Sequence, residues 1–181
     1  MIIVNGVKVS NSNTTYHVLD KELLVIDKSV MELCKRPYYN HKNGCPNYNK
    51  NPSCPPKTKL ITEFLDFEEP IYVFYNCFNL KGHVDVLKKK HPNWTNRQLY
   101  CCLYWQNKAR KQIKDVMDSF VKFLKSKNDR YRFNTWFSLK PEAHGVNVTA
   151  TMNNLGIRLE WPPINYAYQV GLVGVYVEEG K

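Results

Sequence analysis

The sequence has 181 residues, of which 26 are Lys or Arg and 16 are Asp or Glu, giving a formal net charge of +10. With 43% hydrophobic and 13% aromatic residues it has the composition of a globular protein, which excludes a long disordered region. The opening residues lack a basic leader with an apolar core, and about 18 apolar residues never run together. We therefore expect a cytoplasmic protein without a membrane partner, with residues 1–181 forming a single domain.

The N-terminal part predicts a small antiparallel unit followed by a short helix. Asn5 and Gly6 stand between two short β-prone runs, which is the strongest local signal for a two-residue hairpin turn. Asp27 or Ser29 then caps a short helix, with an acidic residue three positions after Ser29 as in a capping box. This helix would place Cys34 at or just past its end.

The stretch 34–56 contains three cysteines, Cys34, Cys45 and Cys54, among many Pro, Asn and Lys residues. Such a composition forms neither a helix nor a strand, so another interaction must fix its shape. The cytosol is reducing, and its cysteines therefore act as thiols or metal ligands more often than as disulfides. We predict that 34–56 is a metal-binding loop holding a metal ion or an iron-sulfur cluster.

The cysteine spacing narrows the type of metal site. Ten and eight residues separate the three thiols, which matches neither the close pairs of a zinc finger nor the tight spacing of a ferredoxin. Burial as a small hydrophobic side chain explains Cys77 and Cys102 better than it explains the loop cysteines. A fourth ligand is left open, with His41, Cys77 and Cys101 as candidates. Without one, an iron-sulfur cluster keeps one iron open to water or substrate.

Hydrophobic periodicity predicts the remaining elements. Alternation of strands and helices from about residue 58 favours an α/β fold, with α+β as the alternative, built on a mixed sheet packed with helices. In chain order we expect a helical pattern over 58–65, a buried strand at 71–78, a helix near 83–90, a long amphipathic helix over 96–126, a strand at 131–139, a helix near 147–154 that Gly156 stops, and strands at 157–161 and 170–177.

The excess positive charge lies in one segment. Residues 81–132 contain 14 Lys and Arg against 4 Asp and Glu, whereas the rest of the chain is balanced. This largely helical segment predicts a surface for nucleic acid or another phosphate-bearing ligand, although a solvated helix face explains the charge equally well. The candidate phosphate-binding residues are Arg97, Lys108, Arg110, Lys111 and Lys114.

Catalytic motifs are scarce in this sequence. It has no P-loop, dinucleotide-binding fingerprint, nucleophile elbow or HExxH motif, so the common nucleotide-hydrolase and serine-hydrolase functions have no support. Glu142 and His144 are the nearest candidates for proton transfer. An ordinary loop histidine remains the alternative interpretation of His144.

Several short motifs resemble a family of uncharacterised predicted metal-binding proteins. The matching features are Cys34, CPNY at 45–48, CPP at 54–56, IYVFY at 71–75 and PEAHGVNVTATMNNLGIRL at 141–159. The resemblance implies metal-binding cysteines and carries no settled activity. It covers about 30–160, but related sequences have further cysteines before the Glu-Ala step, where this chain has none, so it supports only the site at 34–54.

The leading hypothesis is an intracellular protein in which Cys34, Cys45 and Cys54 hold an iron-sulfur cluster, such as a 4Fe-4S cluster. It would act on a phosphate-bearing substrate such as RNA or a nucleotide. The alternative is a non-catalytic nucleic-acid-binding module in which zinc fixes the loop. A third hypothesis leaves the thiols free and makes the protein a partner-binding domain.

Overall fold

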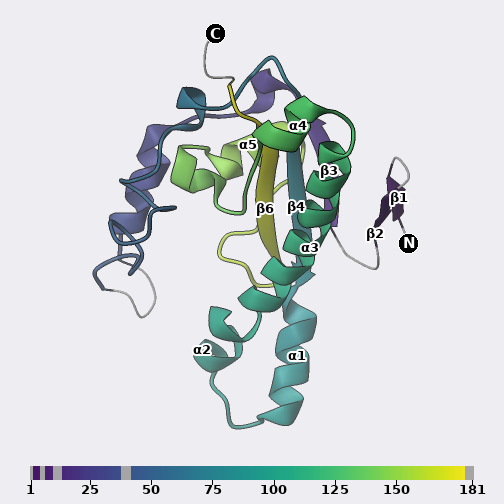
Figure 1. Ribbon diagram of the computed structural model, residues 1–181. Coiled ribbons are helices and arrows are strands. Elements are labelled where there is room, and N and C mark those ends of the chain that lie inside the picture. The colour runs from purple at the N-terminus through teal and green to yellow at the C-terminus, as the bar shows by residue number, and fades with distance from the viewer. Residues whose placement is uncertain (1, 5–6, 10–13, 38–41, 178–181) are drawn as a thin grey trace.

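The computed structural model describes residues 2–4, 7–9, 14–37 and 42–177, and it is built on a four-stranded sheet with helices packed against it (Figure 1). This confirms the predicted fold class. The strands lie in the order β3-β4-β6-β5, with bounds Thr14–Leu19, Ile71–Asn79, Tyr166–Val175 and Thr135–Ser138. A separate two-stranded hairpin pairs β1, Ile2–Val4, with β2, Val7–Val9, as predicted. Its Asn5-Gly6 turn lies outside the described residues.

Every strand pair in the four-stranded sheet is antiparallel, which corrects the expectation of a mixed sheet. The chain crosses over from β4 to β5 through a series of helices, and these two strands do run in the same direction. However, β6 is the last strand in the chain and inserts between them, so each of them pairs with an antiparallel neighbour.

The helices are mostly short, and one long helix dominates. The α-helices are α1 Leu80–Lys90, α2 Asn96–Leu99, α3 Gln106–Lys125, α4 Asp129–Asn134 and α5 Val148–Asn154. The 3-10 helices are η1 Lys21–Leu23, η2 Lys28–Lys35, η3 Ile61–Glu63, η4 Cys102–Tyr104 and η5 Pro141–His144. None of the helices in the described part of the chain combines the length and apolar character that crossing a membrane requires.

Helix α3 covers one face of the sheet. Its apolar side chains recur at intervals of three and four residues, so they form one stripe that packs on the strands. Ile113 and Met117 are fully buried there against Phe74 of β4 and Val173 of β6. Gly171 lets the helix approach closely, because a Cβ atom at that position would lie 2.5 Å from the sulfur of Met117.

The opposite face of the sheet is covered by irregular segments and α5. Val73 and Leu172 pack there against Val146, Met152 and Trp136. Asparagine side chains fix the local geometry, since Asn147 accepts a hydrogen bond from the backbone N–H of Ala150 and starts α5. Helix α5 and its following glycine agree with the predicted helix near 147–154.

The predicted helix over 96–126 is interrupted between α2 and α3, and this is a correction. Thr95 caps α2, but Cys101 is extended and the chain makes only the short helix η4 before α3 begins. The indole N–H of Trp105 donates to the carbonyl of Tyr100 at 3.4 Å, and the ring packs in a small core with Phe78 and Ala109. Burying this large ring requires a change of direction that a straight helix does not allow.

Three further boundaries differ from the predictions. Asn128 caps a helical turn, so the strand predicted at 131–139 is confined to β5. Residues 157–161 form a loop, in which the carboxylate of Glu160 accepts hydrogen bonds from the backbone N–H groups of Asn165 and Tyr166. The 58–65 pattern contains only η3, and Leu65 bridges Tyr176 just past the end of β6.

Candidate metal centre and adjoining pocket

The first half of the cysteine loop is closed by its own backbone. Asp27 caps η2 by accepting from the backbone N–H of Ser29, and the helix carries Cys34 in its last turn. The backbone N–H of Cys45 then donates to the carbonyl of Cys34 at 2.7 Å. Gly44 has a φ of +78°, and a Cβ atom there would lie 2.5 Å from that same carbonyl oxygen. Glycine is therefore required for the return of the chain to Cys34.

The second half of the loop is a set of tight turns. The backbone N–H of Tyr48 donates to Cys45 at 3.0 Å, and that of Asn49 reaches across to the carbonyl of Pro55 at 2.8 Å. Asn49 adopts a positive φ of 57°, which asparagine tolerates better than most residues. These turns return the chain, so that Cys54 is only 7% exposed although it lies in a polar segment.

The three loop thiols form one electrostatic group, and none of them is in a disulfide. Burial raises the pKa of Cys34, and the neighbouring Cys45 and Cys54 thiols raise the pKa further. Glu142 acts in the same direction, whereas Lys140 lowers the pKa of Cys34. The pKa of Cys34 therefore responds to both other predicted ligands and to one acidic and one basic neighbour.

The acidic and basic neighbours come from the segment that follows β5. The ammonium group of Lys140 donates to the sulfur of Cys54 at 3.8 Å, within hydrogen-bond range for sulfur. Glu142 lies in η5, and this exposed residue is nevertheless surrounded by protein groups that raise the pKa of its carboxyl by desolvation. A hydrogen bond to its own backbone and the positive charge of Arg110 oppose that rise. The predicted proton-transfer candidate Glu142 thus lies beside the thiols.

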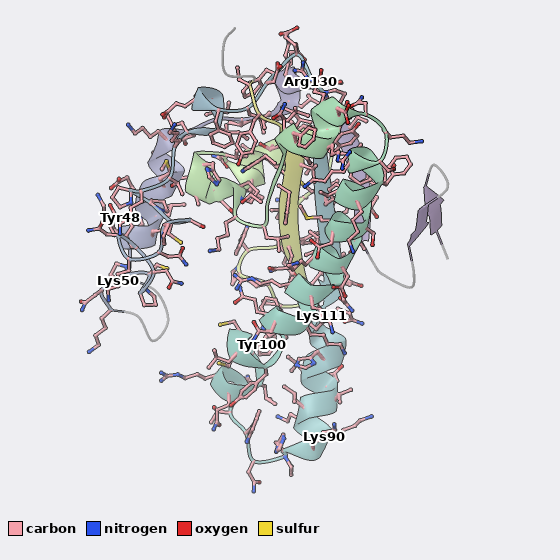
Figure 2. All side chains as sticks on the ribbon, viewed as in Figure 1. Tyr48, Lys50, Lys90, Tyr100, Lys111 and Arg130 are labelled. Carbon is pink, nitrogen blue, oxygen red and sulfur yellow. The ribbon has the colours of Figure 1, made fainter. Side chains whose placement is uncertain are left out.

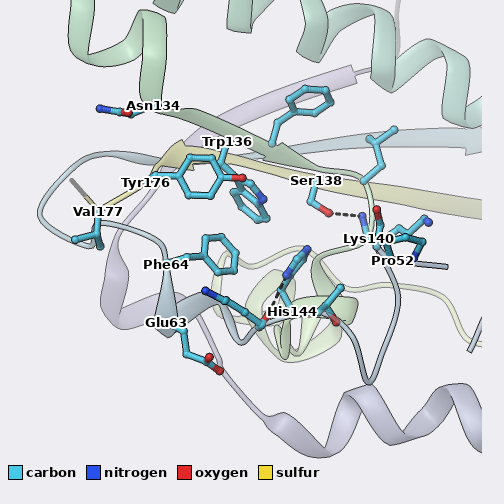
Figure 3. Close-up of a pocket in the computed structure, with 15 residues that line it drawn as sticks. Pro52, Glu63, Phe64, Asn134, Trp136, Ser138, Lys140, His144, Tyr176 and Val177 are labelled. Atoms are coloured by element: carbon cyan, nitrogen blue, oxygen red, sulfur yellow. Dashed lines mark hydrogen bonds between the residues drawn. The ribbon is translucent and has the colours of Figure 1, made fainter. Parts of the chain in front are cut away.

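A wide pocket of about 1440 Å³ adjoins the cysteine loop and follows strand β5. Figure 3 shows Phe64, Trp136 and Tyr176 gathered at one end and Lys140 beside Pro52 at the other. Pro52 belongs to the cysteine loop, and Lys140 also contacts Cys54. The pocket and the thiol group are therefore neighbours that share one cation.

His144 lines this pocket, and its ring is held in one orientation. Its Nδ1 atom lies 3.0 Å from the carbonyl oxygen of Lys59. A carbonyl only accepts, so Nδ1 carries the proton and Nε2 of the neutral ring is the acceptor. The ring also meets Phe64 and Trp136 edge to face, with centroids 5.3 and 5.4 Å apart. Burial lowers the pKa of His144, while the hydrogen bond to Lys59 raises it.

The candidates for a fourth ligand occupy other places. Cys77 lies in β4, where its hydrogen bond to Tyr168, together with burial, raises the pKa of that tyrosine to about 12. Cys101 precedes η4 in the helical part of the fold, and His41 lies outside the described residues. Among the residues that the structure describes, no three His, Cys, Asp or Glu side chains are arranged to hold a single metal ion.

The predicted phosphate-binding residues are all exposed, but they face different neighbours. Arg97 lies in α2, and the other four lie in the first half of α3. Lys114 pairs with Asp118 at 2.5 Å, and Nε of Arg110 donates to Gln169 of β6 at 3.3 Å. Lys111, labelled in Figure 2, lies on the same helix. The charge is thus spread around α3 instead of forming one row.

Sequence reasoning missed the role of Lys140 and the aromatic wall of the pocket. Lys140 lies 86 positions from Cys54 in the sequence, and no local pattern links the two. The only signal was proximity in sequence, because Lys140 directly precedes the segment that contains Glu142 and His144.

Comparison of the chain with protein-family models, with curated proteins and with solved structures finds no match. The resemblance to predicted metal-binding proteins accordingly stays a prediction that rests on the cysteine loop and the 141–159 motif.

Proposed function

We propose that this protein binds an iron-sulfur cluster through Cys34, Cys45 and Cys54. The observation that carries the proposal is the closure of the loop, in which Cys45 hydrogen-bonds back to Cys34 and Cys54 lies within electrostatic range of it. Thiolates are the ligands that hold iron-sulfur clusters. The donor set therefore fits such a group.

We favour a cluster over a single zinc ion because the cysteine spacing lacks the close pairs that are typical of structural zinc sites. Tetrahedral zinc with bonds of about 2.3 Å requires its sulfur ligands to lie about 3.8 Å apart. In this protein, the Cys45 and Cys54 thiols both raise the pKa of Cys34, so both lie within electrostatic range of it. A cluster distributes its cysteine ligands over separate irons, so they lie further apart than the ligands of one ion.

The charges around Cys34 also favour binding of a positively charged group. The other two thiols and Glu142 raise the pKa of Cys34, and Lys140 lowers it. Iron bound there supplies positive charge that favours the thiolate forms. When bound with only three cysteine ligands, the cluster supplies an open iron that acts as a Lewis acid.

In this proposal, a phosphate-bearing substrate such as a nucleotide or a segment of RNA binds in the pocket beside the loop. Lys59 and Lys140 supply charge to a phosphate, and the rings of Phe64 and Tyr176 supply apolar surface to a base. The unprotonated Nε2 of His144 accepts a proton from a substrate in the pocket. At about 1440 Å³, the pocket exceeds the size that most small ligands need.

Cysteine variants test the metal site. Each of Cys34→Ser, Cys45→Ser and Cys54→Ser, prepared anaerobically, should lose iron and visible absorbance together. The matched control is Cys102→Ser, because Cys102 is exposed and lies in η4, outside the loop. Iron that survives all three loop substitutions would contradict the proposal. Zinc in place of iron in the unmodified protein would favour the zinc-stabilised nucleic-acid-binding module instead.

A further inference from the structure

Helices α1 and α2 form a hairpin that projects beyond the end of the sheet (Figure 1). Between residues 86 and 114 the sequence has eight Lys and Arg and no Asp or Glu. Over 80–114, which spans α1, α2 and the start of α3, nine Lys and Arg stand against the single acidic residue Asp85 of α1. Such a surface attracts polyanions at long range.

The charge is densest at the far end of α1. Lys88, Lys89 and Lys90 form its last turn, and Figure 2 shows Lys90 at the end of the helix that is farthest from the sheet. Positive side chains favour a helix C-terminus, which explains part of this enrichment. All three lysines are exposed, and none makes an ion pair with another described residue. Their charge is available to a ligand.

Three aromatic rings form a column directly after these lysines. The rings of His91 and Trp94 are stacked with centroids 4.1 Å apart and planes at 10°, and the ring of Tyr104 lies 5.0 Å from that of Trp94, tilted by 32°. The backbone N–H of Trp94 donates to the carbonyl of His91 at 3.0 Å, and the capping box of Thr95 with Gln98 fixes the next turn. These hydrogen bonds fix the turn that carries His91 and Trp94 in the protein without a ligand.

The outer rings of this column remain accessible. His91 is exposed, Tyr104 is 48% exposed, and the neighbouring Leu103 is 76% exposed. Only Trp94, the middle ring, packs partly on the core of the hairpin. A further flat ring can thus extend the column at an end, next to a cluster of cations.

We propose that the tip of the hairpin binds single-stranded nucleic acid. Unpaired bases stack on the column of His91, Trp94 and Tyr104, and the adjacent lysines of α1 contact the phosphates. A duplex buries the faces of its bases, so only an unpaired strand makes both kinds of contact. This inference rests on the proposed function for its phosphate-bearing substrate, but the tip needs neither the cluster nor the pocket to bind.

Binding of labelled homopolymers of about 12 nucleotides, as single-stranded RNA, single-stranded DNA and blunt duplex, tests the inference. Both single strands should bind, and the duplex should bind at least about tenfold more weakly. Tyr104→Leu should weaken single-strand binding about tenfold, while Tyr104→Phe, which keeps the ring, should bind as the unmodified protein does. Trp161→Leu is the control, because Trp161 is 69% exposed in the 156–165 loop.

A charge-matched pair of variants tests the phosphate contacts. The double variant with Lys89→Gln and Lys90→Gln should reduce the slope of log K for single-strand binding against the logarithm of the salt concentration by about 1.4. Each phosphate neutralised on a single strand contributes about 0.7 to this slope. Lys122→Gln with Lys125→Gln should leave the slope unchanged, since these lysines also form the last turn of a helix but lie at the far end of α3.

Equal binding of duplex and single strands, or unchanged binding by Tyr104→Leu, would overturn the inference. Iron content measured on the same preparations separates it from the proposed function. Protein that holds iron but binds no strand contradicts only the role of the hairpin. Protein that binds strands in the predicted way supports that role, whatever metal it contains.

Discussion

The core under α3 and the cysteine loop fix their shapes by different means. Phe74, Ile113 and Met117 are completely buried between the helix and the sheet, so apolar burial holds that region. In the described part of 34–56 the buried residues are Gly44, Cys54 and Pro55, and the other side chains are partly or fully exposed. The loop is held by backbone hydrogen bonds and tight turns. A segment with so little apolar burial gains most from a bound metal group.

A large-to-small change in the core should give the largest loss of stability. Met117→Ala removes a fully buried side chain that contacts Gly171, and it should lower the free energy of unfolding by about 2–5 kcal/mol. Denaturant unfolding measures this loss. Iron per folded molecule should stay constant, because the cysteine loop does not depend on this core. A parallel fall in iron would show that the two regions are not independent.

A glycine substitution in the cysteine loop should change stability less than Met117→Ala does, and it should change the iron content much more. Gly44→Ala forces a side chain into left-handed backbone and against the carbonyl oxygen of Cys34, so the loop must open. We expect a loss of about 1–3 kcal/mol in unfolding free energy together with loss of iron.

The control for this change is Gly156→Ala. Gly156 also has a positive φ, of 75°, but no atom lies within 4 Å of the position that an added Cβ would occupy. The Gly156→Ala variant should lose only about 1 kcal/mol of unfolding free energy, from backbone strain, and it should keep its iron. Equal iron contents in the two variants would contradict the importance of loop closure.

The smallest expected effect is a change in how the stability of the protein depends on pH, through His144 in the pocket. Burial lowers the pKa of His144, so the folded protein binds a proton there less readily than the unfolded chain, whose histidine pKa is about 6.5. Stability should therefore fall as pH drops from about 6.5 through the folded pKa of His144. His144→Gln should flatten this part of the profile in urea unfolding at several pH values. His83, whose pKa is also lowered by burial, keeps its own contribution in both proteins.

Local sequence patterns predicted the elements that local forces determine. The apolar run of β4 and the stripe of α3 follow from hydrophobic periodicity, and Gly156 with its positive φ ends α5 as expected. The break before α3 was not predictable in this way. The break accompanies the packing of the Trp105 ring with Phe78 and Ala109, which is a tertiary contact that no local pattern shows.

The same distinction between local patterns and tertiary contacts applies to the candidate site. The sequence singled out the three loop cysteines as candidate ligands because a polar segment offers little core in which to bury a thiol, and it offered Glu142 and His144 only as the nearest candidates for proton transfer. The contact of Lys140 with Cys54 and the pocket along β5 arise only when distant segments meet. The stacking of Trp94 on His91 and its tilted contact with Tyr104 likewise need the hairpin to fold, since no local pattern places these three rings together.

Metal analysis of the unmodified protein, purified without oxygen, tests the central claim most directly. Iron and acid-labile sulfide should be present in comparable amounts, with little zinc, and the protein should show broad visible absorption from bonds between iron and thiolate sulfur. Protein that folds normally but contains zinc, or no metal at all, would contradict the account of Cys34, Cys45 and Cys54 as ligands of an iron-sulfur cluster.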